Sequence, residues 1–403
     1  MKEWRKYKLK DFIEFNPKEK VPQGELCRKI SMDQITPFTR FVESNIYEVY
    51  KGGAKFRNYD TIMARITPCL ENGKTVYISS LHPEEVAVGS TEYIVLRKRE
   101  NISDSKFIFY LAISPIVRDI AIKSMVGSSG RQRVQQDVLE NYEIPIPSLP
   151  MQKNIAHILS VLDDKIELNK RINDNLEQQA QVLFKSWFVD NPNSNWKKIS
   201  LSEVASFVGG YSYTGKELTD FSNVAMATIK NFMRNGGFKA EGFKGINPSA
   251  KLKECHYANL FDILVAHTDL TQNADVIGNA ELLLTCGKYN SIIFSMDLVK
   301  VLPKEIFPYS FLLAAMLKNK MFKGHCLGYI NGTTVLHLNK KALPEFEIRK
   351  PSDSEAKIMN ETLAPYYKRM AKLLQETDKL ISLRDTLLPK LMSGELKIND
   401  INN

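Results

Sequence analysis

The sequence predicts an α+β fold in which two related domains alternate with two long helices. Two observations support this. Residues 152–189 and 354–392 carry apolar side chains at helical spacing over a length that helices of globular proteins rarely reach. The segments before these stretches match each other along the chain, and both are rich in short strand-like runs. The predicted order is therefore domain, helix, domain, helix.

Residues 152–189 contain neither Gly nor Pro, and one narrow row of apolar side chains follows helical spacing. At about 1.5 Å per residue, the stretch forms a rod of about 55 Å. Such a helix with a single apolar seam is typical of a coiled coil and needs a partner. Asn169 falls on the seam, where it either fixes the register from a buried position or lies solvated at the edge. The main seam residues are Leu162, Ile166, Asn169, Ile172, Leu183 and Trp187.

Residues 354–392 supply that partner. Their apolar residues alternate in steps of four and three, as in a heptad repeat, with polar interruptions at Thr377 and Arg384. Pro365 should kink the helix or mark a restart, and Gly394 should end it. Two helices of matched length most simply pack antiparallel as a coiled coil. The seam of the second helix includes Leu373, Leu380, Leu387 and Leu391.

The two domains match at both ends. One offset relates Trp4, Leu9 and Phe15 to Trp196, Leu201 and Phe207. A nearly equal offset relates Val134, Leu139, Ile144 and Pro147 to Leu338, Leu343, Ile348 and Pro351. A Trp–Leu match alone could be chance, but agreement at both ends indicates a tandem duplication.

Each domain is predicted to combine short strands with a helical region set apart, which favours α+β over a doubly wound sheet. The expected strands are residues 61–66, 75–79, 85–88, 93–96, 223–229, 262–266, 281–285, 292–295 and 298–302. Helices are expected at 106–123, with an interruption at Pro115, and at 309–323. Ser128-Ser129-Gly130 is among the expected turns.

Composition and charge narrow the class of protein. The chain has 403 residues and a net charge of +9, which permits a polyanionic partner without requiring one. Its five cysteines form no C-x-x-C pair, so neither a zinc ribbon nor a disulfide framework is indicated. The first ten residues lack the apolar core of a signal peptide, and no run of about 18 apolar residues occurs. We therefore expect a cytoplasmic protein.

No catalytic constellation is recognisable. Residues 72–75 resemble the end of a phosphate-binding loop, but Pro68 stands where its first Gly is required. The six histidines lack metal-ligand spacing, so no metal site is predicted. His267 and Asp269 are interpreted as part of a polar loop or a nucleic-acid contact rather than as a catalytic pair. The basic net charge, the duplication and the lack of a recognisable active site together favour a role in recognition.

Duplex DNA is the natural long polyanion with regularly spaced targets. At about 3.4 Å per base pair, a rod of about 55 Å corresponds to about 16 base pairs. Two reading domains separated by such rods would recognise a bipartite site with an unread middle. Because the two domains differ in sequence, the two half-sites should differ too.

Several longer motifs stand out. In the domains these are A-R-I-T-P-C-L-E-N-G-K-T (64–75), G-S-S-G-R-Q-R-V (127–134), L-E-N-Y-E-I-P-I-P (139–147) and N-G-T-T-V-L-H-L-N (331–339). In the helices they are residues 162–173, 183–190 and 383–396. Together these motifs resemble those of the specificity subunit of type I restriction-modification systems. Two positions depart from the pattern: Tyr211-Ser212 stands where the family often has Thr-Pro, and His267 stands where the first domain has Arg65.

The resemblance implies a domain plan and a set of partners. It implies a target recognition domain at 1–150, a central conserved helix at 151–190, a second recognition domain at 191–351, a distal helix at 352–395 and a tail at 396–403. The partners would be double-stranded DNA, two modification (methyltransferase) subunits docked on the helices and two restriction subunits. S-adenosylmethionine, ATP and Mg would belong to those subunits, and this chain would hold no cofactor.

The residues that contact DNA are expected among loop cations and amides, because Arg and Lys suit phosphates and guanine while Asn suits adenine. For each one the alternative is an ordinary solvated side chain. The candidates are Lys55, Arg57, Arg65, Arg131 and Arg133 in the first domain, and Lys216, Lys230, Asn231, Arg234 and Lys239 in the second. Gly127 and Gly332 are expected to serve turn geometry rather than direct contact.

Two alternative functions remain at this point. A self-contained DNA methyltransferase or nuclease would require cofactor or carboxylate motifs that we do not recognise, and it would bind S-adenosylmethionine as a lone chain. A coiled-coil scaffold without DNA would show no salt-dependent DNA binding.

Overall fold

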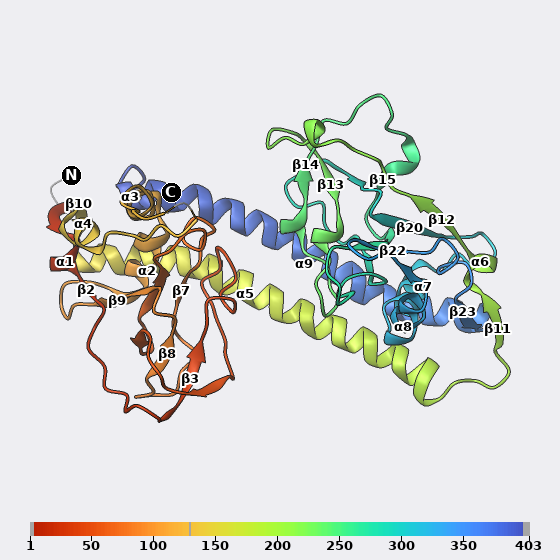
Figure 1. The fold of residues 1–403 in the computed structure, drawn as a ribbon, viewed down its shortest axis with the longest axis horizontal. Helices are drawn as coiled ribbons and strands as arrows, with labels where there is room; N and C mark the ends of the chain where they lie inside the picture. Colours follow the sequence, from red (N-terminus) through yellow and green to blue (C-terminus); the bar gives the residue numbers. More distant parts are fainter. Residues whose placement is uncertain (1–3, 129, 398–403) are drawn as a thin grey trace. The chain divides into compact units, whose positions relative to one another are not determined.

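A computed structural model describes residues 4–128 and 130–397, and the chain divides into two compact units. Unit 1 comprises Met1–Glu167 and Lys379–Asn403, and unit 2 comprises Leu168–Asp378. Figure 1 shows the ribbon coloured along the sequence. Ser129 of the expected turn and residues 398–403 of the expected tail lie outside the described residues. Within them, no helix is both long and apolar enough to cross a membrane.

Unit 1 contains three small sheets. Strand β1 pairs antiparallel with β10, and two four-stranded sheets have the orders β2-β9-β6-β7 and β4-β3-β8-β5. Among the described residues of this unit, β3 runs parallel to β8, whereas the other strand pairs are antiparallel. The strands are β1 Trp4–Lys8, β2 Ile13–Phe15, β3 Leu26–Ile30, β4 Tyr47–Val49, β5 Lys55–Phe56, β6 Thr61–Ala64, β7 Thr75–Tyr77, β8 Ala87–Gly89, β9 Tyr93–Lys98 and β10 Glu143–Pro147.

Unit 2 repeats this arrangement strand for strand. Strand β11 pairs with β23, the four-stranded sheets have the orders β12-β20-β16-β18 and β14-β13-β19-β15, and β13 runs parallel to β19. A further small sheet has the order β17-β22-β21. The strands are β11 Lys197–Ser200, β12 Ala205–Gly209, β13 Val224–Ala227, β14 Lys244–Gly245, β15 Tyr257–Ala258, β16 Ile263–Ala266, β17 Thr268–Asp269, β18 Ala280–Leu282, β19 Ser291–Phe294, β20 Leu298–Pro303, β21 Ile330–Asn331, β22 Leu336–Leu338 and β23 Glu347–Lys350.

The repeated topology confirms the tandem duplication and the α+β class. Each strand that the sequence predicted overlaps an observed one. The register agrees as well, because Tyr7 faces Ile144 in unit 1 and Ile199 faces Ile348 in unit 2. In each domain, the strand at its start therefore pairs with the strand at its end.

The short helices differ from the sequence prediction in one place. In unit 1, α2 (Ser105–Ile113) and α3 (Pro115–Lys123) meet at the expected break before Pro115. In unit 2 the single helix expected at 309–323 is wrong: α7 (Ser310–Leu317) ends and α8 (Lys320–Leu327) begins. The side chain of Asn319 accepts hydrogen bonds from the backbone of Met321 and Phe322, so it caps a new helix. The remaining short helices are α1 Leu9–Phe12, α4 Gln136–Asn141 and α6 Leu201–Val204.

The two long helices form as predicted. Helix α5 spans Leu149–Lys185 and continues into a π-helical turn, Ser186–Asp190, while α9 spans Asp353–Ser393. Gly394, with φ of +74°, follows the end of α9. A kink or a restart was expected at Pro365, and the restart is wrong, since α9 continues through that residue. Leu363 and Tyr367 on either side are buried in the core of unit 2, and this packing stabilises the helix across the proline.

Segments of α5 and α9 run in opposite directions within each unit. In unit 1, the carboxylate of Asp163 pairs with Arg384 at 2.9 Å, and Ile155 packs in the same core as Leu391. In unit 2, the amide of Asn169 donates to Thr377 at 3.3 Å. Asn169 is fully buried, so the buried interpretation of this residue holds.

The predicted seam residues are buried to different degrees. Asn169, Leu373 and Leu391 are completely buried. Leu162, Ile166, Ile172, Leu183, Trp187, Leu380 and Leu387 are half-buried. Polar side chains occupy much of the space between the helices, since Asp163, Asn173 and Arg384 are also buried there. The helices are therefore held partly by polar contacts and not by an apolar seam alone.

Candidate nucleic-acid interface

The loop between β13 and β14 of unit 2 carries several cations, among them Lys230, Arg234 and Lys239. Thr228 caps the 3-10 turn Ile229–Asn231 that opens the loop. The side chain of Asn231 then closes it, because its oxygen accepts from the backbone of Thr228 at 2.9 Å and its nitrogen donates to the carbonyl of Lys239 at 2.9 Å. Asn231 is fully buried, so this candidate shapes the loop and is not accessible to a base.

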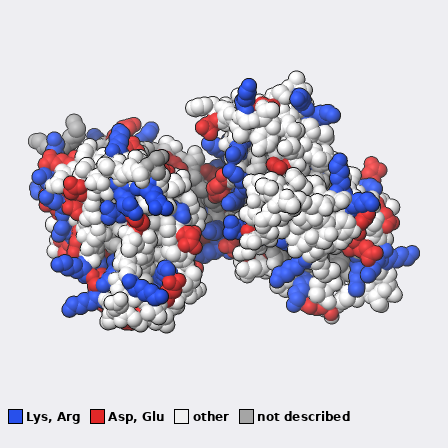
Figure 2. All heavy atoms as spheres, in the orientation of Figure 1, with Lys and Arg blue, Asp and Glu red and all other residues white. Residues whose placement is uncertain are grey.

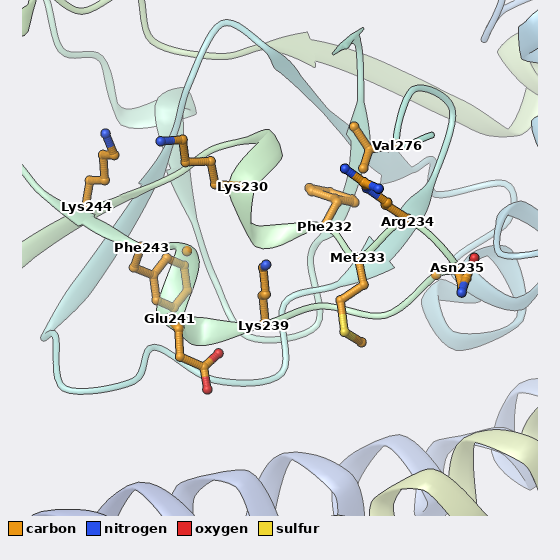
Figure 3. Close-up of a pocket in the computed structure, with 12 residues that line it drawn as sticks. Lys230, Phe232, Met233, Arg234, Asn235, Lys239, Glu241, Phe243, Lys244 and Val276 are labelled. Carbon is orange, nitrogen blue, oxygen red and sulfur yellow. The ribbon is translucent and has the colours of Figure 1, made fainter. Parts of the chain in front are cut away.

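The loop borders an open hollow of about 850 Å³. The ammonium groups of Lys230, Lys239 and Lys244 surround Phe243, while Arg234 lies beside Phe232 (Figure 3). Lys230 and Lys239 are exposed, and Arg234 is held by Asp275 at 3.4 Å. Three of the five cations and amides predicted for this domain therefore meet at one opening. Lys216 is exposed on a separate turn before β13.

A group of buried charged side chains holds the β13–β14 loop in place. The Lys318 ammonium lies 2.7 Å from Glu281 on β18 and 3.0 Å from Glu177 on α5. The second oxygen of Glu281 accepts a hydrogen bond from the backbone of Gly237 in the loop. Burial alone would lower the pKa of Lys318, but the two carboxylates raise it above its ordinary value, so the side chain is charged. The loop is thus connected through one buried ion triad to helix α5.

The cations predicted in unit 1 are mostly engaged with other residues. Arg57 pairs with Glu19 at 2.8 Å and with Glu84 at 3.1 Å. Lys55 donates to the carbonyl of Glu19 and lies over the ring of Tyr50. Arg57 remains 40% exposed, so a phosphate can still approach it. Its partners reduce the charge that it presents.

A hairpin at residues 126–133 carries two further candidates. The backbones of Val126 and Arg133 pair across it, and Arg133 forms an ion pair with Glu92 at 2.7 Å. Arg131 is exposed, and the structure gives it no ion pair with any described residue. A Cβ on Gly127 would lie 2.8 Å from the carbonyl oxygen of Arg131, so the tight turn requires glycine. This agrees with the geometric role predicted for Gly127.

The matching hairpin of unit 2 has the same backbone restraint. Gly332 has φ of +109°, and a Cβ there would lie 2.2 Å from the carbonyl oxygen of Val335. The closing strands are fixed alike, because Val134 donates to the carbonyl of Arg65 and Leu338 to that of His267. The correspondence between Arg65 and His267 is therefore a structural one. The Arg65 side chain is half-buried and donates weakly to Val134, at 3.4 Å.

Asp269 has a structural role in its loop. Its carboxylate accepts backbone hydrogen bonds from Thr271, Val276 and Ile277. Burial would raise the pKa of this carboxyl, but these hydrogen bonds lower it below its ordinary value. Among the described residues, no group of three or more His, Cys, Asp and Glu side chains is arranged to hold a metal ion.

Comparison with known proteins identifies the family. A model of the type I restriction modification DNA specificity domain matches residues 1–178 and 193–382. The chain belongs to this family. The domain model matches the chain twice, which agrees with the repeated sheets described above. This makes the chain a DNA sequence-specificity subunit with two domains.

Individual relatives agree with the assignment. The specificity subunit of the type I restriction enzyme HindI from Haemophilus influenzae is 25% identical over 400 residues, covering 84% of this chain and 86% of that protein. The EcoAI specificity subunit from Escherichia coli is 32% identical over 213 residues, covering 49% of this chain and 36% of that protein. A solved type I S subunit from M. genitalium shares the fold, with a TM-score of 0.54, 15% identity and 96% coverage of both chains.

Sequence reasoning missed several residues of the specificity subunit's surface. Lys244 and Phe243 line the hollow but were not among the candidates. The adjacent aromatic, cation and glycine at 243–245 were the available signal, because stacking platforms for nucleic acids interleave aromatic and basic residues. The buried triad of Glu177, Lys318 and Glu281 gave no signal, since its members lie far apart in the sequence.

Proposed function

We propose that this subunit reads an asymmetric, bipartite DNA site, with unit 1 on one half-site and unit 2 on the other. The observation that carries the proposal is that one sheet framework occurs twice with different side chains on its loops. Arg65 of one unit stands where the other has His267. Identical frameworks with different loops read different sequences, so the two half-sites differ.

In unit 2 the cationic hollow is the proposed contact with DNA. The exposed ammonium groups of Lys230 and Lys239 suit phosphate oxygens, and the aromatic floor at Phe243 excludes water beside them. In unit 1 the exposed Arg131 on the hairpin is the proposed contact with DNA. Arg57 and Arg133 are already paired with carboxylates, so they would contribute less to affinity and more to positioning.

The long helices are the proposed docking surface for modification subunits. Leu168 is 50% exposed and Val182 is 65% exposed, although both lie on α5. At about 100° per residue, Leu168 and Val182 lie within about 40° of each other around the helix axis, and about 100–160° from the buried Asn169 and Ala180. Exposed apolar side chains on the outward face of a packed helix, here called the docking row (Leu168 and Val182), indicate a contact with a protein partner. Two modification subunits and two restriction subunits would complete the assembly.

The catalytic groups would reside on those partners. S-adenosylmethionine for methyl transfer, and ATP with Mg for DNA cleavage, would bind to the modification and restriction subunits. This chain would supply DNA selection and assembly. On this view, purified alone, it binds DNA in a salt-dependent manner and does not bind S-adenosylmethionine.

The decisive experiment maps methylated adenines across a host genome with and without this gene, in the presence of its modification subunit. Loss of one asymmetric bipartite motif is the expected result. An unchanged methylome in a strain whose modification subunit is active would refute the proposal. For docking, Leu168→Glu with Val182→Glu should abolish co-purification of the modification subunit. Ile306→Glu, at a side chain that is 66% exposed but not on a long helix, should leave it intact.

A further inference from the structure

Phe221 is the most exposed large apolar side chain among the described residues, at 92%. It lies in the short loop between the 3-10 turn Gly215–Glu217 and β13. Exposed apolar side chains are common on proteins, but a phenyl ring with almost no intramolecular contact is unusual. The backbone and side chains around Phe221 indicate whether its exposure serves a function.

The backbone on both sides of Phe221 is fixed. Before it, Thr219 donates to the carbonyl of Gly245 at 3.0 Å, and after it, the Ser222 hydroxyl donates to the carbonyl of Ile246 at 2.8 Å. A Cβ on Gly245 would lie 2.2 Å from the carbonyl oxygen of Thr219, so the close approach depends on glycine there. The ring is held in solvent by an ordered loop.

This loop adjoins the cationic hollow. Lys244, which lines the hollow, directly precedes the Gly245 that holds the Phe221 loop. A second, smaller hollow of about 380 Å³ is lined by Phe221 together with Lys288 and Tyr289. The ring of Tyr289 packs edge-on against Phe243 of the larger hollow, with centroids 6.3 Å apart. The two hollows thus share an aromatic wall.

Cations continue across both hollows. The Lys288 ammonium lies 5.5 Å from the centroid of the Tyr289 ring, next to Phe221. Lys288, Lys230, Lys239 and Lys244 give the two hollows a basic excess over their two lining carboxylates, Glu241 and Asp220. Figure 2 shows basic and acidic atoms interspersed over the drawn face. A basic track that ends in one projecting aromatic ring matches the chemistry of proteins that wedge apolar side chains between base pairs.

We propose that Phe221 inserts between two base pairs at the edge of the half-site read by unit 2, unstacking that step and bending the duplex. Lys288 contacts the phosphate beside the opened step. The inference rests on the proposed function, since it requires unit 2 to bind DNA. A step that unstacks easily, such as TA or CA/TG, would be favoured there without any base contact.

The neighbours of Phe221 favour DNA over a protein partner. Asp220, Ser222 and Asn223 surround the ring with polar groups. A protein interface requires a contiguous apolar patch, whereas a wedge requires one apolar side chain between polar flanks. The carboxylate of Asp220 would be repelled by a phosphate. In the minor groove it can accept a hydrogen bond from the guanine amino group, the one donor on that edge.

The test uses the full-length chain assembled with its modification subunits on a duplex carrying the motif found by methylome mapping. Bending is measured by fluorescence energy transfer between the duplex ends, and unstacking by 2-aminopurine placed at each step of the half-site. Phe221→Ala should abolish the bend and the fluorescence rise, and should weaken binding about tenfold, as expected for loss of one stacking contact. Phe221→Leu, which keeps an apolar wedge, should retain most of both signals.

The controls separate the possible failures. Ile306→Ala, at another exposed apolar side chain, should bend DNA as the unmodified protein does. The slope of affinity against salt should stay the same in Phe221→Ala, because no phosphate contact is lost. An unchanged bend in Phe221→Ala overturns the wedge. A weakened assembly with modification subunits and a normal bend assigns the residue to a protein contact and also overturns it. Absence of salt-dependent DNA binding by the unmodified complex would instead refute the proposed function.

Discussion

Replacement of Lys318 by Met tests how the recognition loop of unit 2 is supported. The side chain is 9% exposed and lies between Glu281, which is 5% exposed, and Glu177, which is 20% exposed. Methionine fills a similar volume but leaves two largely buried carboxylates without their cation. Removing one partner of a buried ion pair costs about 3–5 kcal/mol. For a unit of this size the unfolding midpoint should fall by about 10 °C.

Unfolding of unit 2 can be followed through Trp187 and Trp196, which pack against its core. Hydrogen exchange should accelerate at the backbone of Gly237, because Glu281 loses the group that holds it in place. Lys320→Met, at the exposed start of α8, is the matched control and should change neither quantity. Combining Lys318→Met with Glu177→Gln and Glu281→Gln should recover most of the lost stability, since no buried charge remains unpaired. A loss below about 1 kcal/mol in the single variant would refute the triad as a support.

The interface, the start of α9 and the lengths of the two long helices can each be tested by substitution or deletion. Replacing the three lysines around Phe243 by Ala should weaken DNA binding and flatten the plot of log affinity against log salt by about 0.9 per lost phosphate contact, as measured by fluorescence anisotropy. Hydrogen bonds from the Ser352 hydroxyl, and to a smaller extent from the Ser352 backbone and the Trp196 side chain, lower the pKa of Glu355 from its ordinary value of 4.5 to about 2. The ionised Glu355 carboxylate therefore stabilises the fold fully at pH values above 4.5, and this contribution is lost as the pH falls towards 2. Between these pH values the melting temperature of Glu355→Gln should depend less on pH than that of the unmodified protein. Deleting one heptad from each long helix should shorten the unread spacer of the DNA motif by about three base pairs, because about 10.5 Å is removed at about 1.5 Å per residue; an unchanged spacer in the methylome would show that the helices do not set it.

The fold was largely predictable because its signals are periodic. The apolar spacing of α5 and α9 extends over many turns, and the duplicated ends of the domains lie in strands with matching register. The predicted helix boundaries were wrong at positions where a single residue determines whether a helix ends or continues. The break between α7 and α8 depends on Asn319, whose side chain caps the second helix. Helix α9 continues through Pro365 because tertiary packing outweighs the lost hydrogen bond.

The interface was less predictable, because residue type does not reveal accessibility. Asn231 has the side chain that reads adenine, but its amide is consumed in closing its own loop. Arg133 has the charge that binds phosphate, but Glu92 already neutralises it. Phe221 and Lys288 are separated by many residues and meet only because β13 pairs with β19. Such contacts arise from the sheet order, which local patterns do not encode.

The framework explains how the two units can share a fold and differ in their loops. The closing strands are held by backbone hydrogen bonds, from Val134 to Arg65 and from Leu338 to His267, which any side chain permits. The surface residues are therefore free to differ without loss of the scaffold. The recognition loop of unit 2 is additionally tied through Lys318 to Glu177 on α5. Since α5 also carries the proposed docking row, a change in how the loop contacts DNA has a direct physical route to the helix on which the modification subunit would sit.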